Sequence, residues 1–334
     1  MSALKRFSLT FGCMLTILAA PMAQNAVPAR QVGNISGDFI PNQVEKGLRP
    51  QWAKSIMKAN ADRPYIYNVK DGEADIFGQM RYQKNMKGMG LIKLTSDNPG
   101  KFEWIRDYGY IAGSTPILTA GTYVGDEYYA FETTFYNNIN MPKAISVVNI
   151  NTGEYVAKKM IQNPTDRRPL ILDEMTYDPK TDRIFGLNYD TDAQTSYIYE
   201  IDRTSLELKH VATIPSLIFT LAADNGCLYA MSMTARGSML NKIEISSINA
   251  AAKTCTMTNT GVDTGVRMGD YSQSMEFDKT THRLWWLAQT EDGGASFVEL
   301  DAETGEAKSK TSLSNDLQLL AMAIPYQYVP DATP

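Results

Sequence analysis

Carboxylates are the side chains of this sequence best suited to catalysis, because it holds only two histidines, His210 and His282. Asp173 and Glu174 are adjacent in one short segment, and Glu276 lies in a second segment of the same kind. Two carboxyl groups that flank one glycosidic bond, about 5 to 9.5 Å apart, can hydrolyse it. Successive residues of a strand point to opposite faces, so Asp173 and Glu174 cannot both face one site. Glu174 and Glu276 are therefore the candidate catalytic pair.

Other catalytic signatures are missing from the sequence. It has no P-loop, nucleophile elbow or metalloprotease helix motif. Two histidines and three cysteines are too few for histidine-rich or zinc–cysteine clusters, so we expect no metal and no cofactor. Asp190 and Asp192 resemble half of a calcium loop, but no glycine or distant glutamate completes it. They are read as a solvated acidic loop and kept as ligand-binding candidates.

Charge and composition narrow the class of partner. The chain has 32 Lys and Arg against 37 Asp and Glu, a net charge of -5, and a pI near 5.3. This balance argues against nucleic acid or an anionic membrane as the main partner. With 43% apolar and 10% aromatic residues, the chain is too hydrophobic to be disordered.

The segments that must position these side chains form a repeat. A short apolar triplet with a central aromatic residue recurs five times, at intervals of 44 to 56 residues: Ile76-Phe77-Gly78, Tyr128-Tyr129-Ala130, Ile184-Phe185-Gly186, Leu228-Tyr229-Ala230 and Leu284-Trp285-Trp286. A second strand-like run follows each triplet: Leu91–Leu94, Val147–Ile150, Ile198–Ile201, Lys242–Ile245 and Phe297–Leu300. Both patterns predict β-strands within one repeated unit.

Turns and further short runs complete each unit as four antiparallel strands. A strand and a tight turn precede a triplet, as in Asp224-Asn225-Gly226, and a turn and a fourth strand follow the second run. Units of this size that stack radially form a β-propeller, whereas a linear β-solenoid uses shorter repeats. We therefore predict an all-β fold, a single β-propeller domain over residues 63–330.

The number of blades depends on the terminal strand. Leu319–Tyr326 resembles the first strand of a unit and has no successors, so it can complete the first unit and close a ring of five blades. If Tyr65–Val69 serves as that first strand instead, a sixth, partial blade is needed. Five blades with C-terminal closure are preferred.

Several turns resemble those of a known family. Leu300-Asp301-Ala302-Glu303-Thr304-Gly305 and Asn149-Ile150-Asn151-Thr152-Gly153 look like turns of bacterial quinoprotein-like (PQQ-type) propeller repeats. The resemblance implies the fold and not the function. It does not imply a quinone cofactor, because the calcium-assisted site with neighbouring cysteines of the quinoprotein dehydrogenases has no match here.

Aromatic and amide side chains supply the remaining binding candidates. Phe135, Tyr136, Asn137 and Asn138 follow the second triplet, in a loop on the propeller face that commonly binds ligands. Such a loop suits a sugar or a peptide, although an Asn-rich turn with its rings folded inward explains it equally well. Trp286 is a further candidate, because Trp285 already occupies the repeat position and its neighbour should face the other way.

The N-terminus has the layout of a secretory signal peptide. Lys5 and Arg6 precede a 14-residue apolar run, and small residues follow before a cleavage site after Ala23. The run is too short for a membrane span, which needs about 20 residues, and Cys13 lies too close to Arg6 for a lipoprotein. We predict a signal peptide (1–23), an N-terminal extension (24–62), and a periplasmic or cell-surface location.

Two cysteines remain after cleavage. Cys227 and Cys255 fall on the second and fourth strands of one unit, about two strand spacings apart, which exceeds the reach of a disulfide. Two buried free thiols are expected.

Taken together, these observations favour a non-enzymatic scaffold that binds a carbohydrate or an envelope protein through its loop face, without a membrane span. The alternative is a carboxylate-dependent glycoside hydrolase or lyase that uses Glu174 and Glu276. The histidines are expected to be ordinary surface or edge residues, one in a fourth strand and one in a hairpin turn.

Overall fold

The computed structural model describes residues 73–82, 89–109, 116–125, 127–134, 143–162, 170–269, 273–291, 294–313 and 317–326. All of them belong to the compact unit Ile40–Pro334. The predicted signal peptide, the N-terminal extension, the alternative strand Tyr65–Val69 and the Phe135–Asn138 candidates lie outside the described residues.

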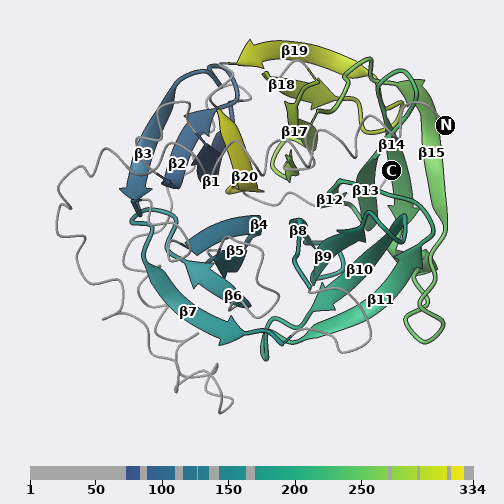
Figure 1. The fold of residues 1–334 in the computed structure, drawn as a ribbon, viewed down its shortest axis with the longest axis horizontal. Helices are drawn as coiled ribbons and strands as arrows, with labels where there is room; N and C mark the ends of the chain where they lie inside the picture. The colour runs from purple at the N-terminus through teal and green to yellow at the C-terminus, as the bar shows by residue number, and fades with distance from the viewer. Residues whose placement is uncertain are drawn as a thin grey trace. The chain divides into compact units, whose positions relative to one another are not determined.

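Strands β1 to β20 form five four-stranded antiparallel sheets arranged as the blades of a ring (Figure 1). The fold is thus a five-bladed β-propeller, as predicted. From the centre outward, blade I consists of β20 (Gln318–Ala323), β1 (Asp75–Tyr82), β2 (Gly90–Thr95) and β3 (Phe102–Asp107). Blade II consists of β4 (Pro116–Val124), β5 (Glu127–Thr134), β6 (Lys143–Val148) and β7 (Tyr155–Met160).

The other three blades repeat this order. Blade III consists of β8 (Glu174–Asp178), β9 (Arg183–Asp190), β10 (Thr195–Ile201) and β11 (Leu208–Ile214). Blade IV consists of β12 (Thr220–Asp224), β13 (Cys227–Met233), β14 (Ser238–Glu244) and β15 (Met257–Asp263), with the short 3-10 helix η2 (Ile245–Ser247) after β14. Blade V consists of β16 (Ser274–Asp278), β17 (Arg283–Gln289), β18 (Ala295–Leu300) and β19 (Ala307–Leu313).

The C-terminal strand closes the ring. β20 pairs antiparallel with β1, so that Ala323 lies opposite Phe77 and Leu319 opposite Met80. A Cβ atom on Gly78 would lie 2.7 Å from the Leu319 side chain, so the third position of this triplet must stay small. The predicted closure by the terminal strand is confirmed, and the strand itself ends at Ala323.

The repeated aromatics form the core between blades. Phe77, Tyr129, Phe185, Tyr229 and Trp285 are all buried. Trp285 stacks on Phe297 with ring centroids 4.9 Å apart. Burying such a side chain contributes about 1.5–3 kcal/mol, so the triplets hold neighbouring blades together.

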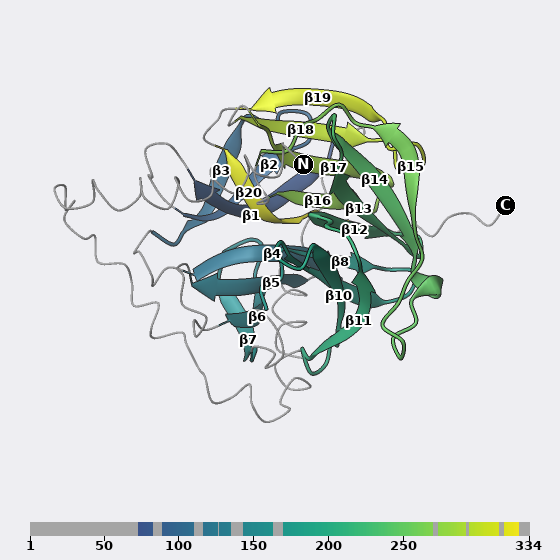
Figure 2. The same cartoon turned by 45° about the vertical axis from the view of Figure 1, so that its right-hand side comes forward.

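The inner strands line the centre of the ring. β20, β4, β8, β12 and β16 contact one another in that order around it, and the turned view shows β16 between β12 and β20 (Figure 2). We call the centre of the ring, which these inner strands surround, the channel, and residues of three of them provide the predicted acids and their neighbours. Among the described residues, no helix is long and apolar enough to span a membrane.

Candidate functional site

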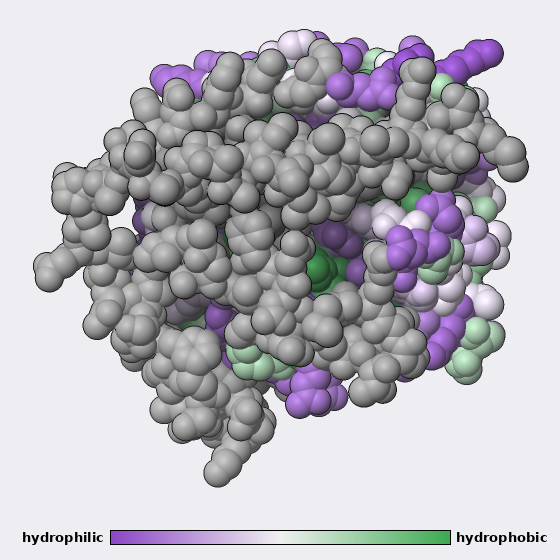
Figure 3. Space-filling model, viewed as in Figure 1, coloured by the Kyte–Doolittle hydropathy of each residue, from purple (hydrophilic) through white to green (hydrophobic). Residues whose placement is uncertain are grey.

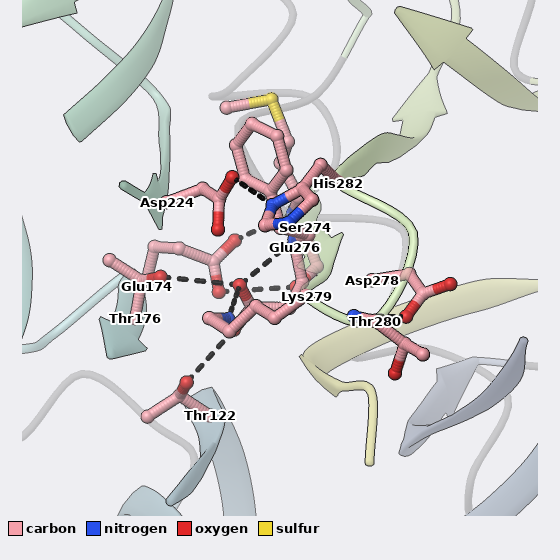
Figure 4. Close-up of polar contacts among 12 residues, drawn as sticks. Thr122, Glu174, Thr176, Asp224, Ser274, Glu276, Asp278, Lys279, Thr280 and His282 are labelled. Atoms are coloured by element: carbon pink, nitrogen blue, oxygen red, sulfur yellow. Dashed lines mark hydrogen bonds and ion pairs between the residues drawn. The ribbon is translucent and has the colours of Figure 1, made fainter. Parts of the chain in front are cut away.

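The two predicted acids both lie on inner strands and face the channel (Figure 4). Glu174 is the first residue of β8, and Glu276 is the middle residue of β16. Their exposed fractions are 0% and 1%. The structure therefore brings the predicted pair together, in a place that solvent does not reach.

Glu276 accepts hydrogen bonds from three blades. Its Oε2 accepts the hydroxyl of Thr122 in blade II at 2.8 Å, and its Oε1 accepts the hydroxyl of Thr176 in blade III at 3.2 Å. Within its own blade, Oε1 also accepts the backbone N–H of Phe277 at 2.9 Å and the ammonium of Lys279 at 2.7 Å. One carboxylate thereby crosslinks β4, β8 and β16.

Glu174 contacts the channel from the other side: it belongs to blade III and reaches blade V, whereas Glu276 belongs to blade V and reaches blades II and III. Its Oε1 accepts the hydroxyl of Ser274 at 3.1 Å, and its Oε2 accepts the backbone N–H of Met275 at 3.0 Å, both in blade V. The Ser274 oxygen in turn accepts the backbone N–H of Met322 in β20 at 2.9 Å. The closure strand is thus tied to the same set of contacts. We call Thr122, Glu174, Thr176, Ser274, Glu276 and Lys279 the channel network.

Burial dominates the electrostatics of the channel network. It raises the pKa of Glu276 above its ordinary value, although Lys279 opposes the shift. It raises the pKa of Glu174 well above its ordinary value, and the nearby charge of Glu276 raises that pKa further. Low dielectric disfavours the charged form of each acid.

Lys279 is a member that the sequence analysis did not single out. Its side chain is 1% exposed, and its ammonium lies 5.5 Å from the ring centroid of Tyr326, just after the closure strand. A cation near an aromatic face is attracted to it. The only sequence signal was a lysine three residues after Glu276.

His282 also lies closer to the channel than expected. It occupies the hairpin turn between β16 and β17, as predicted, but its Nδ1 lies 2.7 Å from Oδ2 of Asp224, the last residue of the inner strand β12. The other oxygen of Asp224 is buried without a hydrogen-bond partner, and burial raises the pKa of this acid. His210 lies in the fourth strand β11, as predicted.

Asp173 marks the loop-face end of the inner strand β8. The residue is partly exposed, and its Oδ2 accepts the backbone N–H of Tyr189 at 3.3 Å. The side-chain amide of Asn188 hydrogen-bonds the Asp173 carboxylate and also donates to the Ile171 carbonyl at 2.8 Å. Burial raises the pKa of Asp173 to about 8. A carboxylic acid that is neutral near pH 7 can both donate and accept hydrogen bonds.

The acidic candidates Asp190 and Asp192 lie in the hairpin between β9 and β10, on the same loop face. The Asp190 carboxylate accepts the backbone N–H groups of Asp192 at 2.9 Å and Ala193 at 3.1 Å. This is a local turn motif. Within the described part of the chain, no three His, Cys, Asp or Glu residues are grouped in a way that could hold a metal.

Trp286 lies in the core. It is 0% exposed, and its indole N–H donates to the Gln273 side chain at 2.9 Å. It packs with side chains of blade IV, whereas Trp285 packs with side chains of blade I. The two rings face opposite ways, as predicted, and both are covered by protein.

The two cysteines are free, as expected, but only Cys227 is buried. Cys255 is half-buried and precedes β15 instead of lying in it, because the fourth strand of blade IV begins at Met257. Burial, together with the hydrogen bond to Glu244, raises the pKa of the Cys227 thiol to about 12. A thiol in this state is a poor nucleophile.

Comparisons with known proteins assign no family to the chain. No family model and no curated protein matches the chain. Among solved structures, TolB from Acinetobacter baumannii is 10% identical over 76% of this chain and 67% of its own, with a TM-score of 0.44. An exo-β-1,3-galactanase from Phanerochaete chrysosporium is 11% identical over 72% of this chain and 60% of its own, with a TM-score of 0.48.

A periplasmic gluconolactonase from Pseudomonas aeruginosa is 7% identical over 75% of this chain and 98% of its own, with a TM-score of 0.37. Of the galactanase, by contrast, this chain covers less than two thirds of the length. Identities this low carry no information on activity. The resemblance to quinoprotein repeats is not confirmed by these comparisons.

Proposed function

We propose that the protein is an exported, non-enzymatic propeller that binds a carbohydrate or an envelope protein through its loop face. The loop face is the side on which the second strand of each blade ends and the next inner strand begins. It presents Asp190 and Asp192, and the sequence predicts that Phe135, Tyr136, Asn137 and Asn138 belong to the same face.

The observation that carries this proposal is the burial of the channel acids. A hydrolase acid must reach the glycosidic oxygen of its substrate. Glu174 and Glu276 have 0% and 1% exposure, and their oxygens accept hydrogen bonds from neighbouring inner strands. Both therefore act as crosslinks between blades in this arrangement.

The loop face offers chemistry that suits a neutral or hydroxyl-rich ligand. Asp173, Asn188 and Tyr189 gather there beside the acidic hairpin, and combine a carboxyl group, an amide and an aromatic ring. Tyr189 is partly exposed and packs edge-on against Phe219, with ring centroids 5.6 Å apart. Groups that donate and accept hydrogen bonds next to an aromatic surface match the hydroxyls and C–H faces of a sugar.

The rival function is a glycoside hydrolase or lyase, and one observation favours it. Two glutamates with raised pKa values on facing inner strands are a frequent feature of catalytic sites. The two proposals differ in whether bound polysaccharide is cleaved.

The test is a panel of polysaccharides screened for both retention and released sugar. We expect retention without release, and equal retention by Glu174→Gln. The control Glu207→Gln alters an exposed acid on the outer rim. Sugar release that Glu174→Gln abolishes while the variant stays folded would overturn the non-enzymatic proposal.

A second experiment locates the binding surface. Tyr136→Ala with Asn137→Ala is expected to weaken retention at least tenfold, with unchanged circular dichroism. Glu306→Ala, in the turn between β18 and β19 on the other side of the ring, is the matched control and should bind as wild type. If no polysaccharide is retained, a protein of the envelope becomes the expected ligand.

A further inference from the structure

The channel contains more acids than cations. Among the described residues, the inner strands carry five buried acids, namely Glu174, Asp178, Asp224, Glu276 and Asp278. The bases that contact these acids are Lys279 and His282. An ionised carboxylate without a counter-ion is very costly to bury. At least one of these acids must therefore be neutral when the ring is folded.

The contacts decide which acid that is. Glu276 accepts from the Lys279 ammonium at 2.7 Å, and Asp224 lies 2.7 Å from the His282 ring nitrogen. The side-chain oxygens of Glu174 accept from the Ser274 hydroxyl and from the backbone N–H groups of Met275 and Met175, all of which are neutral. Asp178 and Asp278 accept from N–H and hydroxyl groups of part-buried turns. Glu174 differs from all four, because its contacts with Ser274 and Met275 are both fully buried and neither comes from a basic group.

We infer that the channel network is a proton-dependent clasp, in which one proton held by Glu174 allows blades III and V and the closure strand to be joined across the channel. The proton leaves Glu276 and Lys279 as a balanced ion pair. Because Ser274 contacts both Glu174 and the backbone of Met322, the protonated acid lies one side chain away from the strand that closes the ring.

The surrounding groups do not supply a second cation. Tyr128 stays neutral, because burial raises the pKa of its phenol well above the ordinary value and Glu174 raises it further. Asp178 lies near Asp224 and adds negative charge, and Tyr326 presents its ring to Lys279. Loss of the proton would place a second negative charge beside Glu276.

The sign of the pH effect follows from this. The pKa of Glu174 is raised in the folded chain, so its contribution to stability is complete below the ordinary glutamate pKa. The contribution is lost as the pH rises through the folded-state value. The clasp is therefore closed at low pH and weakened as the pH rises through the folded-state pKa of Glu174.

The test compares thermal unfolding of the full-length wild type and Glu174→Gln from about pH 5 to about pH 10. Glutamine keeps the shape and cannot ionise, so we expect a folded variant whose Tm falls less on the alkaline side. The Tm difference between the two proteins should change by roughly 5 °C or more over this range. Parallel curves would overturn the inference.

Two further measurements keep the result decisive. Glu276→Gln leaves Lys279 without its counter-ion and should lower Tm at every pH without flattening the curve. If this variant flattens the curve and Glu174→Gln does not, the proton resides on the other acid and the assignment is wrong. Infrared spectra of wild type should show a protonated-carboxyl band that weakens in Glu174→Gln, and an unchanged band would contradict the inference even if one variant fails to fold.

Discussion

Ion pairs between lysine and glutamate occur both in the channel and on the outer rim of the propeller, buried in the channel and exposed to solvent on the rim. Lys279 and Glu276 are each 1% exposed, whereas Lys242 and Glu303 on the rim are 26% and 78% exposed. In the channel no water can replace a lost partner, so each group depends on the other. On the rim both groups remain hydrated, and their attraction is weak and screened by salt.

The rim pairs nevertheless follow the repeat. An acid in the turn between the third and fourth strands of one blade meets a base of a neighbouring blade, as Glu154 meets Arg106 at 3.6 Å and Glu207 meets Lys159 at 3.4 Å. Hydrophilic side chains cover much of the described rim on the face seen in Figure 3, and hydrophobic surface is visible near the centre. Although these rim ion pairs recur at the same place in successive blades, their exposure to solvent means that each contributes little to stability.

Removing the closure strand should have the largest effect. A chain that ends after Leu313 lacks β20, which exposes the edge of β1 and removes the Met322 contact with Ser274. We expect loss of cooperative unfolding and rapid proteolysis. A chain that ends after Tyr326 keeps β20 and should unfold like the full-length protein.

Lys279→Ala should be the most damaging single substitution in the channel. It leaves Glu276 buried without its counter-ion, and breaking such a pair costs about 3–5 kcal/mol. Denaturant unfolding measures this loss. The double variant Lys279→Met with Glu276→Gln should recover part of it, since no uncompensated charge remains, and a double variant less stable than Lys279→Ala would contradict this account.

The pKa values of two aspartates, Asp173 at the end of an inner strand and Asp301 on the outer rim, provide a second comparison of buried and exposed surroundings. Burial raises the pKa of Asp173 to about 8, whereas backbone N–H groups, Thr304 first, and Lys308 lower that of Asp301 to about 2. The contribution of Asp173 to stability is complete in acid and lost as the pH rises towards 8, and that of Asp301 is lost as the pH falls towards 2. Carboxyl NMR titration, with Asp173→Asn and Asp301→Asn for assignment, measures both. Similar values near 4 would show that the surroundings do not differ.

The smallest effect is expected on the rim. Lys242→Ala removes the contact with Glu303 at 3.4 Å and should cost about 1 kcal/mol or less. Its effect should shrink further at high salt. A loss comparable to that of Lys279→Ala would mean that exposure does not set the strength of these pairs.

Local patterns in the sequence were sufficient to predict the fold. The aromatic triplets predicted the second strand of every blade, and Asp224-Asn225-Gly226 predicted a tight hairpin, which the structure confirms with positive φ at Asn225 and Gly226. The unmatched strand near Leu319 predicted closure. These features depend on strand period and turn chemistry, which neighbouring residues determine.

The channel network could be predicted only in part. Glu174 and Glu276 were recognised as acids on inner strands, but their partners are distant in sequence. Thr122 lies 154 residues from Glu276, and Ser274 lies 100 residues from Glu174. No local pattern reports which hydroxyl a folded ring brings to a given carboxylate. The sequence also gave no sign that Asp224 and His282, in successive blades, would meet.

The order in which the strands are synthesised gives the closure strand a temporal role. β1 emerges early, but its inner partner β20 is translated only after the other four blades are complete. Until then blade I has no strand at the centre, and the unpaired edge of β1 is open to association with other chains. The nascent protein therefore cannot reach its final state blade by blade, and any factor that delays release of the last strand prolongs an aggregation-prone intermediate.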